Sequence, residues 1–587
     1  MKHAHCAARK VRGAEHRTVA ERDDSSSRIR SGPSRALGKL FQIALVVMIP
    51  AIARAMPPMA GSEMDMMGTQ DGARDRAPVD YGFGPGKGKV RHSSPGTSAG
   101  TPYVLGSVPP GGSAAGAEGY FDPPVTWPII GLHQILLPDG RVLNYGTNEV
   151  GQQGAAEYYD VWDPKFGTGL DAHLVLPNTT HTDIFCSDQS MLWRTGEVLI
   201  TGGDMTVDDT RNYSNNHTTI FSPRTNSIRP ARPMAYKRWY PSIVAMPSGE
   251  MLVLGGRTAP SNSAAITPEL FNPATGWSTL SGAASDLAFN DSYGWYYPRA
   301  FLRPDGDVFL VDFAGRIWTI DTSSGGTIDQ SQTTTLQSSP SLPIVMYAPG
   351  MLLSLRISVV DKNPVAASET IAFNGSKPVI TPTGPIDQLR QWSNATVLAD
   401  GRVFVNGGST ESNKLPGILS SQIWDPGSGA WTTGASAAIA RLYHSTALLL
   451  PDATVLTAAG GAPGPLKNLN AEIYFPPYLY LNDGSGNPAP RPTLVSAPSD
   501  IAVGKTVTAT VGSADTISRV TFVRTGSVTH STNNDQRFID LPFTQTGNVI
   551  QASLPGNSNI LLPGYYMMFV FEGYTPSVAR IMRVQLP

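Results

Sequence analysis

The sequence predicts an all-β protein: a seven-bladed kelch-type β-propeller followed by a C-terminal Ig-like β-sandwich. Glycine and proline are abundant, with 59 and 49 of 587 residues, and only 15% of the residues are charged. This composition is typical of turn-rich β-proteins. One hairpin phrase recurs seven times, and shorter alternating strands follow it to the C-terminus. The length also exceeds a single ordinary core, so we expect more than one domain.

The repeated phrase is an apolar strand, a Pro-Asp-Gly type turn, a second strand rich in β-branched residues, and then Gly-Gly. It is clear in LLPDGRVLNYG at 136–146 and degenerate in YAPGMLLSLRI at 347–357. Successive turns are 44 to 57 residues apart, which matches the kelch period of about 50 residues. Seven repeats of four strands close a propeller, predicted here over 119–487. The turn positions are Gly140, Gly196, Gly249, Gly306, Gly350, Gly401 and Ala453.

The pattern changes over 488–587, where alternating apolar and polar residues define short strands. TVTATVG at 506–512, SRVTFVR at 518–524 and YYMMFVF at 565–571 are three of them. Their close spacing predicts a small Ig-like β-sandwich.

The N-terminus has the pattern of an export signal. Residues 1–39 are rich in arginine and lysine, and an apolar run of 14 residues at 40–53 leads into Ala-Arg-Ala. We therefore predict a signal peptide over 1–55 and a secreted or cell-envelope protein. A membrane anchor is the alternative, but a span needs about 20 apolar residues and this run contains Gln42 and Pro50.

Residues 56–118 lack hydrophobic periodicity and are predicted to form a flexible linker rich in Met, Gly and Pro. Five methionines crowd into 56–67. Because thioethers are soft ligands that suit Cu(I), a copper-capture tail is the alternative to a solvated linker.

Charge and cysteine content exclude two classes of protein. The formal net charge is −2, and no long basic block follows the N-terminal segment, so we expect no nucleic-acid partner. Cys6 and Cys186 are the two cysteines, which excludes a disulfide framework. Signal cleavage would leave Cys186 alone, either as a buried inert thiol or as a cysteine consumed by another covalent bond.

The propeller register gathers chemically active residues at one end of the channel, because the innermost strands line it. The residues nine positions before their turns include Tyr240, Tyr297, Trp392 and His444, and those ten positions before include Cys186 and Tyr443. Imidazole and phenolate donors suit Cu(II) better than zinc. A tyrosine beside such a metal can be a ligand, a base or a one-electron reservoir. Cys186 beside Tyr240 would have an oxidative route to a thioether.

Four segments resemble the radical-copper oxidases, a family that includes galactose oxidase and glyoxal oxidase. HTDIFCSDQSM (181–191) resembles the segment with the cross-linked cysteine, and RWYPS (238–242) the one with its tyrosine partner. ARLYHSTALLLPD (440–452) is similar to the segment with the axial tyrosine and first histidine. VTHSTNNDQR (528–537) is similar to the hairpin that carries a second histidine. The resemblance runs from about residue 120 to the C-terminus.

The resemblance implies one copper ion held by Tyr240, Tyr443, His444 and His530. It also implies a thioether radical cofactor formed from Cys186 and Tyr240, with Tyr443 as the base that takes the substrate proton. Cys186, Tyr240 and Tyr443 are thus the expected catalytic residues. Copper and the radical each accept one electron, so O₂ would return as H₂O₂. The other histidines lack metal-ligand spacing and predict no second metal.

The sequence departs from galactose oxidase where a tryptophan follows Gly-Gly and stacks on the thioether, because Arg257 and then Thr258 follow Gly-Gly here and the stacking role is vacant. Trp239 or Trp392 would shield the radical from another direction, or simply pack between blades. We also expect no N-terminal sugar-binding β-domain like that of galactose oxidase, because residues 56–118 lack the pattern to build it. These departures, and the resemblance of RWYPS to the corresponding segment of glyoxal oxidase, favour small aldehydes over galactose as the substrate.

Arg299 and Trp392 are the candidate substrate-binding residues, with a surface arginine as the alternative for Arg299. A primary-alcohol or carbohydrate oxidase of the galactose oxidase type is the first alternative function. A non-catalytic glycan-binding or structural propeller is the second. We expect a monomer that meets a small aldehyde or alcohol and O₂, with a cell-envelope glycan as a further candidate partner.

Overall fold

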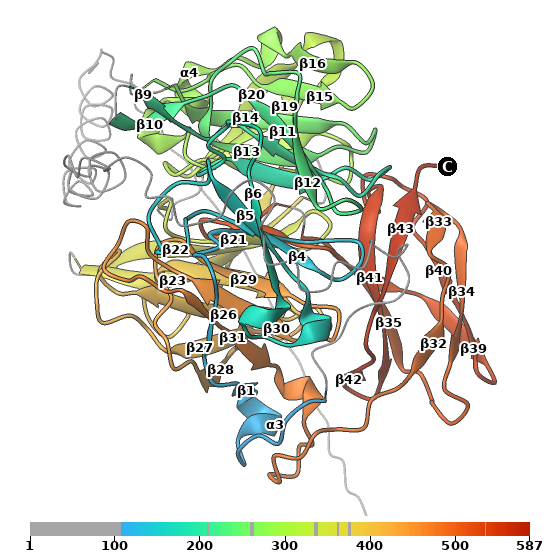
Figure 1. Ribbon diagram of the computed structural model, residues 1–587. Helices are drawn as coiled ribbons and strands as arrows, with labels where there is room; N and C mark the ends of the chain where they lie inside the picture. Colours follow the sequence, from blue (N-terminus) through green and yellow to red (C-terminus); the bar gives the residue numbers. More distant parts are fainter. Residues whose placement is uncertain are drawn as a thin grey trace, which may run out of the picture. The chain divides into compact units, whose positions relative to one another are not determined.

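Seven propeller sheets and a β-sandwich make up the part of the chain that the computed structural model describes (Figure 1). This part comprises residues 107–207, 210–258, 263–333, 338–360, 363–373, 377–534 and 536–587. The predicted signal peptide, Cys6 and the methionine-rich segment lie outside these residues. Within them, no helix has the length and apolar character needed to cross a membrane.

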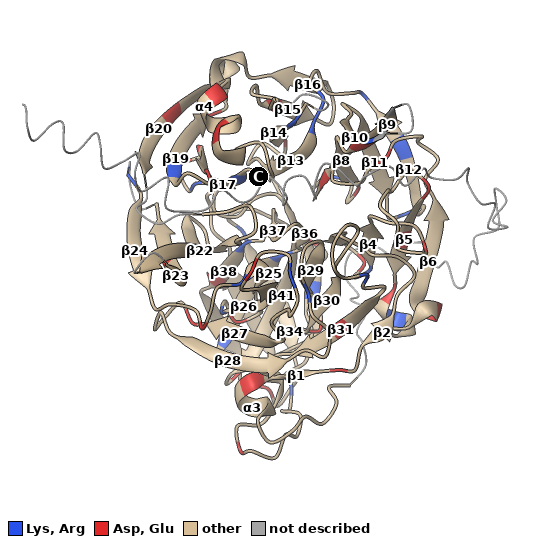
Figure 2. Cartoon of the chain, turned by 90° about the vertical axis from the view of Figure 1, so that its left-hand side faces the viewer, with Lys and Arg blue, Asp and Glu red and all other residues tan. Residues whose placement is uncertain are grey.

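The predicted fold class is confirmed, since each repeated hairpin forms the first two strands of one sheet. Figure 2 places β13, β17, β25 and β29 near the centre and β12, β16, β24 and β28 at the rim. Five propeller sheets have four strands each. The first two are β7 (Asp188–Met191), β8 (Val198–Thr201), β11 (Thr218–Ser222) and β12 (Ser227–Ala231), and β13 (Trp239–Ala245), β14 (Met251–Arg257), β15 (Glu269–Asn272) and β16 (Gly276–Thr279). The other three are β17 (Arg299–Leu302), β18 (Val308–Val311), β19 (Arg316–Asp321) and β20 (Thr327–Thr333); β21 (Ile344–Ala348), β22 (Met351–Val360), β23 (Asn363–Ala372) and β24 (Val379–Thr383); and β25 (Gln391–Val397), β26 (Val403–Ser409), β27 (Ser420–Trp424) and β28 (Trp431–Ser436).

The last blade is completed by strands from the beginning of the propeller. Its strands β29 (Ser445–Leu449), β30 (Val455–Ala459) and β31 (Asn470–Phe475) pair in order. Both β1 (Tyr120–Phe121) and β2 (Val125–Thr126) then pair with β31. The two ends of the propeller segment therefore close the ring through backbone hydrogen bonds.

The first blade is extended by the C-terminal domain. Its strands are β3 (His133–Leu136), β4 (Val142–Tyr145), β5 (Tyr158–Trp162) and β6 (His173–Pro177). A hairpin of β36 (Ser527–Thr529) and β37 (Thr532–Asn533) adds to the edge of β3. This hairpin brings part of the second domain to the propeller centre (Figure 2).

The turns of the repeated hairpins need the left-handed backbone region. Gly249 has φ of +85°, and a Cβ there would lie 1.9 Å from Nε1 of Trp193, so glycine is required by both conformation and space. Ala453 occupies the corresponding turn with φ of +68°. The seventh repeat therefore keeps the turn without glycine.

The predicted sandwich forms after residue 490 with two sheets around an apolar core that includes Val507, Phe522, Ile550 and Met568. One sheet contains β32 (Leu494–Ser496), β34 (Thr506–Val511), β40 (Val549–Ser553) and β39 (Phe543–Thr546). The other contains β33 (Asp500–Ala502), β43 (Arg580–Gln585), β41 (Gly564–Glu572), β35 (Arg519–Arg524) and β38 (Phe538–Leu541), with β42 (Thr575–Pro576) beside β41.

Short elements connect these sheets. Residues 107–118, the described end of the expected linker, include the helix α3 (Ala115–Glu118), and the Glu118 carbonyl accepts a hydrogen bond from Tyr474. The other short elements are β9 (Asp204–Val207), β10 (Thr210–Ser214), α4 (Asp286–Phe289) and the 3-10 helices Pro164–Phe166, Leu170–Ala172, Ser281–Ala283, Asp291–Tyr293, Ser323–Gly325 and Pro477–Leu479.

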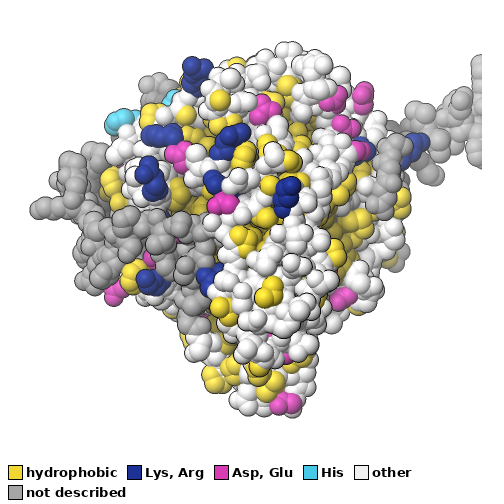
Figure 3. Space-filling model, turned by 90° about the vertical axis from the view of Figure 1, so that its right-hand side faces the viewer, with side chains coloured by type: hydrophobic (Ala, Val, Ile, Leu, Met, Phe, Trp, Pro, Cys, Tyr) yellow, Lys and Arg dark blue, Asp and Glu magenta, His cyan; other side chains and the backbone are white. Residues whose placement is uncertain are grey.

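Charges are mixed on the face drawn in Figure 3. Its basic side chains lie singly or in small groups among acidic, apolar and other side chains. This distribution agrees with the formal net charge of −2.

Candidate metal centre

The segments just before the inner strands lie against one another at one end of the channel. The backbone N–H of Tyr240 donates to the carbonyl of Cys186 at 3.0 Å, and that of Tyr297 donates to the carbonyl of Tyr240 at 2.9 Å. Neighbouring blades are thus joined directly at these residues. The structure brings together the residues that the register places nine and ten positions before their turns.

Most of these residues share an unusual backbone conformation. Cys186, Tyr240, Tyr297, Trp392 and His444 have φ values of 54°, 65°, 40°, 63° and 67°. Left-handed backbone at bulky residues costs about 1–3 kcal/mol each and concentrates at functional sites. The positive φ turns each segment from the connection between blades into the inner strand. The same conformation recurs in several blades.

His530 arrives from the C-terminal domain on the β36–β37 hairpin. The Val528 carbonyl accepts a hydrogen bond from Gln189 Nε2 at 3.2 Å, and the Ser527 hydroxyl donates to the Gln189 carbonyl at 2.7 Å. Asn534 donates to the carboxylate of Asp188 at 2.6 Å. These bonds hold the hairpin against the blade that carries Cys186, so the ring of His530 reaches the site.

Within the described part of the chain, Cys186, His444 and His530 form a buried group whose ligand atoms all lie within 4.8 Å of one another. Nδ1 of His444 lies 2.7 Å from the Gly461 carbonyl, so this nitrogen carries the proton. Nε2 of His444 is buried and has no hydrogen-bond partner among the described residues. Its lone pair is therefore available to a metal.

Two phenols complete the donor set. The Oη atoms of Tyr240 and Tyr443 lie 3.2 Å apart, and the ring centroids of Tyr443 and His444 are 3.7 Å apart. The Tyr240 ring lies 5.3 Å from that of His530. Two imidazoles and two phenols thus surround one buried point, and this set of N and O donors fits Cu(II).

Burial controls the protonation of the site. It raises the pKa of Tyr240 and of Tyr443 well above 10.0, and it lowers the pKa of His444 to about 3 and that of His530 well below 6.5. The imidazoles are therefore neutral and the phenols protonated in the metal-free protein. Metal binding would release the phenolic protons, because ligation favours the charged form.

Cys186 is a buried free cysteine beside Tyr240. Burial raises the pKa of its thiol well above 9.0, and a hydrogen bond with the Tyr240 side chain opposes that shift. Its Sγ also lies 3.7 Å from Nε2 of His530. The thiol is thus shielded from solvent and adjacent to both a phenol and an imidazole nitrogen.

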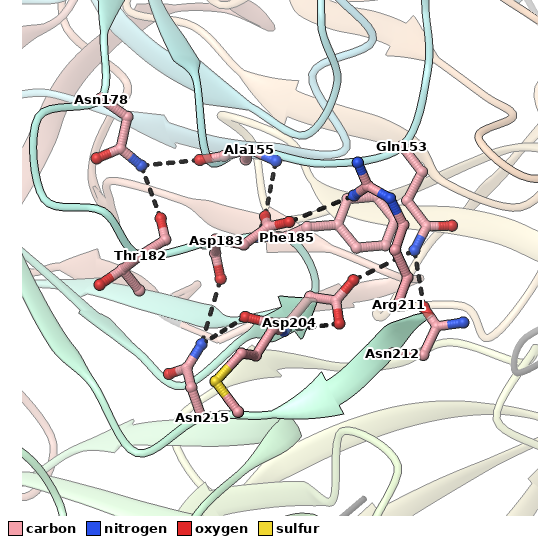
Figure 4. Close-up of polar contacts among 11 residues, drawn as sticks. Gln153, Ala155, Asn178, Thr182, Asp183, Phe185, Asp204, Arg211, Asn212 and Asn215 are labelled. Atoms are coloured by element: carbon pink, nitrogen blue, oxygen red, sulfur yellow. Dashed lines mark hydrogen bonds and ion pairs between the residues drawn. The ribbon is translucent and has the colours of Figure 1, made fainter. Parts of the chain in front are cut away.

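A buried carboxylate network holds the segment that leads into Cys186 (Figure 4). Oδ1 of Asp183 accepts from the backbone N–H of Ala155 at 2.7 Å and of Phe185 at 3.0 Å. The backbone N–H of Asp204 donates to the Phe185 carbonyl at 3.0 Å. Arg211 faces Oδ2 of Asp183 at 3.4 Å. The residue before Cys186 is therefore fixed at both its N–H and its carbonyl.

Arg299 is buried, with 2% of its surface exposed, so the surface-arginine alternative is wrong. Its guanidinium donates to the carbonyls of Tyr297 at 3.1 Å, Pro340 at 2.8 Å and His530 at 3.4 Å. Burial lowers the pKa of Arg299 to about 10. These contacts position the His530 hairpin, and substrate binding by Arg299 stays a prediction.

Trp239 and Trp392, the two expected shields of the radical, contact different tyrosines. Trp392 packs edge-on to Tyr443 at 4.5 Å, whereas Trp239 lies 4.3 Å from the Tyr240 ring at 32°. Trp239 is thus the predicted shield that contacts Tyr240. Substrate binding by Trp392 stays a prediction.

Tyr296 and Trp295 were not predicted from the sequence, and His133 was set aside there with the other histidines. The Tyr296 hydroxyl lies 3.4 Å from that of Tyr443, and the Trp295 ring is stacked 6.1 Å from Tyr240. Both belong to the aromatic run 295–297, from which the register selects only Tyr297. His133 is buried 5.7 Å from the His530 ring, with Nε2 unpartnered among the described residues. The aromatic run itself was the available signal for the first two.

Comparisons with known proteins agree with this geometry. Residues 491–584 match the family described as "Galactose oxidase-like, Early set domain". The galactose oxidase of Gibberella zeae is 28% identical over 500 residues, which cover 79% of this chain and 70% of that protein. Aldehyde oxidase GLOX1 of Arabidopsis thaliana is 23% identical over 521 residues, covering 77% of this chain and 79% of that one. Over these lengths the chain is similar to galactose oxidases and aldehyde oxidases, as its sequence motifs predict.

The fold is shared with a solved fungal alcohol oxidase of the AA5 family in complex with copper. The TM-score is 0.70 at 22% identity, over 80% of this chain and all of that one. Similarity to copper-dependent oxidases confirms the predicted enzyme class and removes support from a non-catalytic propeller. The relatives differ in substrate, so the family alone leaves the substrate of this oxidase open.

Proposed function

We propose that this protein oxidises small aldehydes to acids with reduction of O₂ to H₂O₂, at one copper ion held by Tyr240, Tyr443, His444 and His530. The observation that carries the proposal is the buried convergence of two phenols and two imidazoles, with Nε2 of His444 lacking a partner among the described residues. An unpaired buried ring nitrogen is costly unless a ligand uses it.

Copper bound there would exchange one electron and polarise a substrate oxygen. Residues of this chain orient the two imidazoles. The Gly461 carbonyl fixes His444, the Thr529 hydroxyl contacts Nδ1 of His530 at 2.5 Å, and both imidazoles remain neutral.

We further propose that Cys186 and Tyr240 form a thioether. The new C–S bond replaces the thiol S–H and one ring C–H, and the two electrons and two protons released pass to O₂ in the presence of copper. The side-chain contact of Cys186 with Tyr240 supports this step. The sulfur then delocalises a phenoxyl radical, which serves as the second one-electron acceptor.

Tyr443 is the proposed base. Its phenolic oxygen contacts the hydroxyls of both Tyr240 and Tyr296. A proton taken from an aldehyde hydrate or an alcohol can therefore pass along these hydrogen bonds. Tyr240 is committed to Cys186, which leaves Tyr443 as the unmodified phenol. Positioned bases of this kind contribute roughly 10² to 10⁴ in rate.

Small aldehydes are the substrates that we favour. The RWYPS segment, the arginine at position 257 and the similarity to aldehyde oxidases support this choice. Primary alcohols or carbohydrates are the second candidate, favoured by the 28% identity to a galactose oxidase.

The deciding experiment combines copper content, peptide mass and peroxide production on one preparation. We expect one copper per chain, joined Cys186 and Tyr240 peptides lighter by two hydrogens, and faster peroxide release with aldehydes than with galactose. Cys186→Ser is the matched control, which binds copper without forming the link. A freely alkylated Cys186 in active enzyme would overturn the thioether, and faster turnover of galactose would favour the second candidate.

We also propose export of the protein through the signal over 1–55, and action as a monomer. The basic segment, the apolar run and Ala-Arg-Ala support export. N-terminal sequencing of secreted protein should start at or near Met56, and retention of residues 1–39 would contradict it. Light scattering should give the mass of one chain.

A further inference from the structure

Arg257 directly follows Gly255-Gly256, and the strand register fixes its neighbours. It ends β14, and its cross-strand partner on β13 is Trp239, the residue before Tyr240. The preceding Gly256 donates its backbone N–H to the Trp295 carbonyl at 2.8 Å. Arg257 is therefore held between two tryptophan-bearing segments.

The guanidinium lies over both indoles. Its Cζ is 5.6 Å from the Trp239 ring centroid and 5.9 Å from that of Trp295. Both distances are within the range of cation–π attraction. The two rings are buried, while Arg257 is only partly exposed to solvent. The cation is thus fixed by stacking on both indoles.

The same two indoles pack on Tyr240. The Trp239 ring is 4.3 Å from the Tyr240 ring, and the Trp295 ring is stacked with it at 6.1 Å and 29°. Burial lowers the pKa of Arg257, and attraction to the ionised form of Tyr240 opposes this shift. A fixed positive charge therefore faces Tyr240 across one layer of aromatic rings.

We propose that Arg257 sets the reduction potential of the thioether formed by Cys186 and Tyr240. In this couple the neutral phenoxyl radical gains one electron and becomes the phenolate anion. A nearby cation stabilises the anion and not the neutral radical, so it raises the potential. A neutral side chain at position 257 would not stabilise the anion in this way. The inference rests on the proposed function, because it needs the thioether.

The test measures the potential rather than turnover. Copper-loaded Arg257→Gln should still form the link, and its radical should be easier to generate in a spectrophotometric redox titration. We expect the equilibrium with a given mediator to shift by about tenfold, which is about 59 mV for one electron. Arg257→Lys keeps the positive charge, so it should shift the reduction potential by less than half as many mV as Arg257→Gln.

Arg194→Gln is the matched control. Arg194 also lies over an indole, 4.6 Å from the Trp193 ring, but at the far end of the β7–β8 hairpin from Cys186. It should leave the potential unchanged. Thr258→Glu tests the charge with Arg257 in place, and the added acid should lower the potential.

The outcomes separate the two proposals. No mass loss in the wild-type peptides would reject the thioether and the proposed function. A formed link with unchanged potentials in Arg257→Gln and Thr258→Glu would reject the role of Arg257 alone. If Arg257→Gln does not fold, Thr258→Glu decides by itself.

Discussion

The phenolic oxygens of Tyr240 and Tyr443 lie 3.2 Å apart, although 203 positions separate the two residues in the chain. Their surroundings differ. Tyr240 contacts Cys186 and two indoles, whereas the Tyr443 hydroxyl lies against that of Tyr296 and its ring packs on Trp392. This asymmetry supports one tyrosine as the radical store and the other as the base.

Tyr443→Phe should separate copper binding from catalysis. The ring still packs on His444 and Trp392, and three proposed ligands remain, so most of the copper and the thioether should be retained. Turnover should fall by roughly two to four orders of magnitude because the base is lost. Copper content, peptide mass and peroxide release from one sample check this. Tyr297→Phe is the control, since its hydroxyl donates to the Ser187 carbonyl, and near-wild-type turnover of Tyr443→Phe would assign the base elsewhere.

His530→Ala should weaken copper binding although this residue belongs to the C-terminal domain. The β36–β37 hairpin keeps its pairing with β3, so the variant should fold while losing one of two imidazole ligands. We expect a copper dissociation constant raised by at least roughly tenfold, measured by competition with a chelator. His217→Ala removes an exposed imidazole that contacts Thr182 and should change nothing. Equal affinities in both variants would show that His530 is not a ligand.

Tyr296→Phe tests the hydrogen bond to the proposed base. A neutral hydrogen bond contributes about 1 kcal/mol, which corresponds to roughly a fivefold change in rate. We therefore expect a turnover number lowered by roughly threefold to tenfold, with copper content unchanged. Steady-state kinetics beside copper analysis measures both, and an unchanged rate would exclude Tyr296 from the proton path.

Asp204→Asn should alter the pH dependence of stability. Burial, followed by the charge of Asp183, raises the pKa of Asp204 well above 3.8. The native state then holds a proton that the unfolded chain releases at lower pH, so stability is lost as the pH rises from 3.8 through the native pKa. Asparagine does not titrate, and its carbonyl oxygen can still accept the bond from the Met205 N–H.

The melting temperature of metal-free Asp204→Asn, relative to wild type, should therefore be higher at pH 8 than at pH 4. Calorimetry at the two values measures the difference. Asp540→Asn is a suitable control, since this carboxylate lies in an exposed ion pair with Arg519. An equal offset at both pH values would show that Asp204 is ionised in the native protein.

Much of the fold could be predicted because the repeat is local. The turn residues and the alternation of each hairpin act over about ten neighbours, so the repeated phrase predicted all seven blades. A fixed offset from those turns then predicted Cys186, Tyr240, Tyr443 and His444 at one end of the channel. The offset is informative because shifting a strand's register by one residue would move its side chains to the opposite face of the sheet. His530 came from resemblance, because no spacing relates the sandwich to the propeller.

Sequence patterns were enough to predict the blades, the sandwich and the candidate donors on the propeller. Three features required the folded structure: β1 and β2 complete the last blade, Tyr296 contacts Tyr443, and Arg257 lies over two indoles facing Tyr240. The reason is physical: hairpins form from short-range backbone preferences, whereas these contacts depend on how distant segments pack around a common axis. That packing is set by the whole ring of blades and cannot be obtained from any one of them.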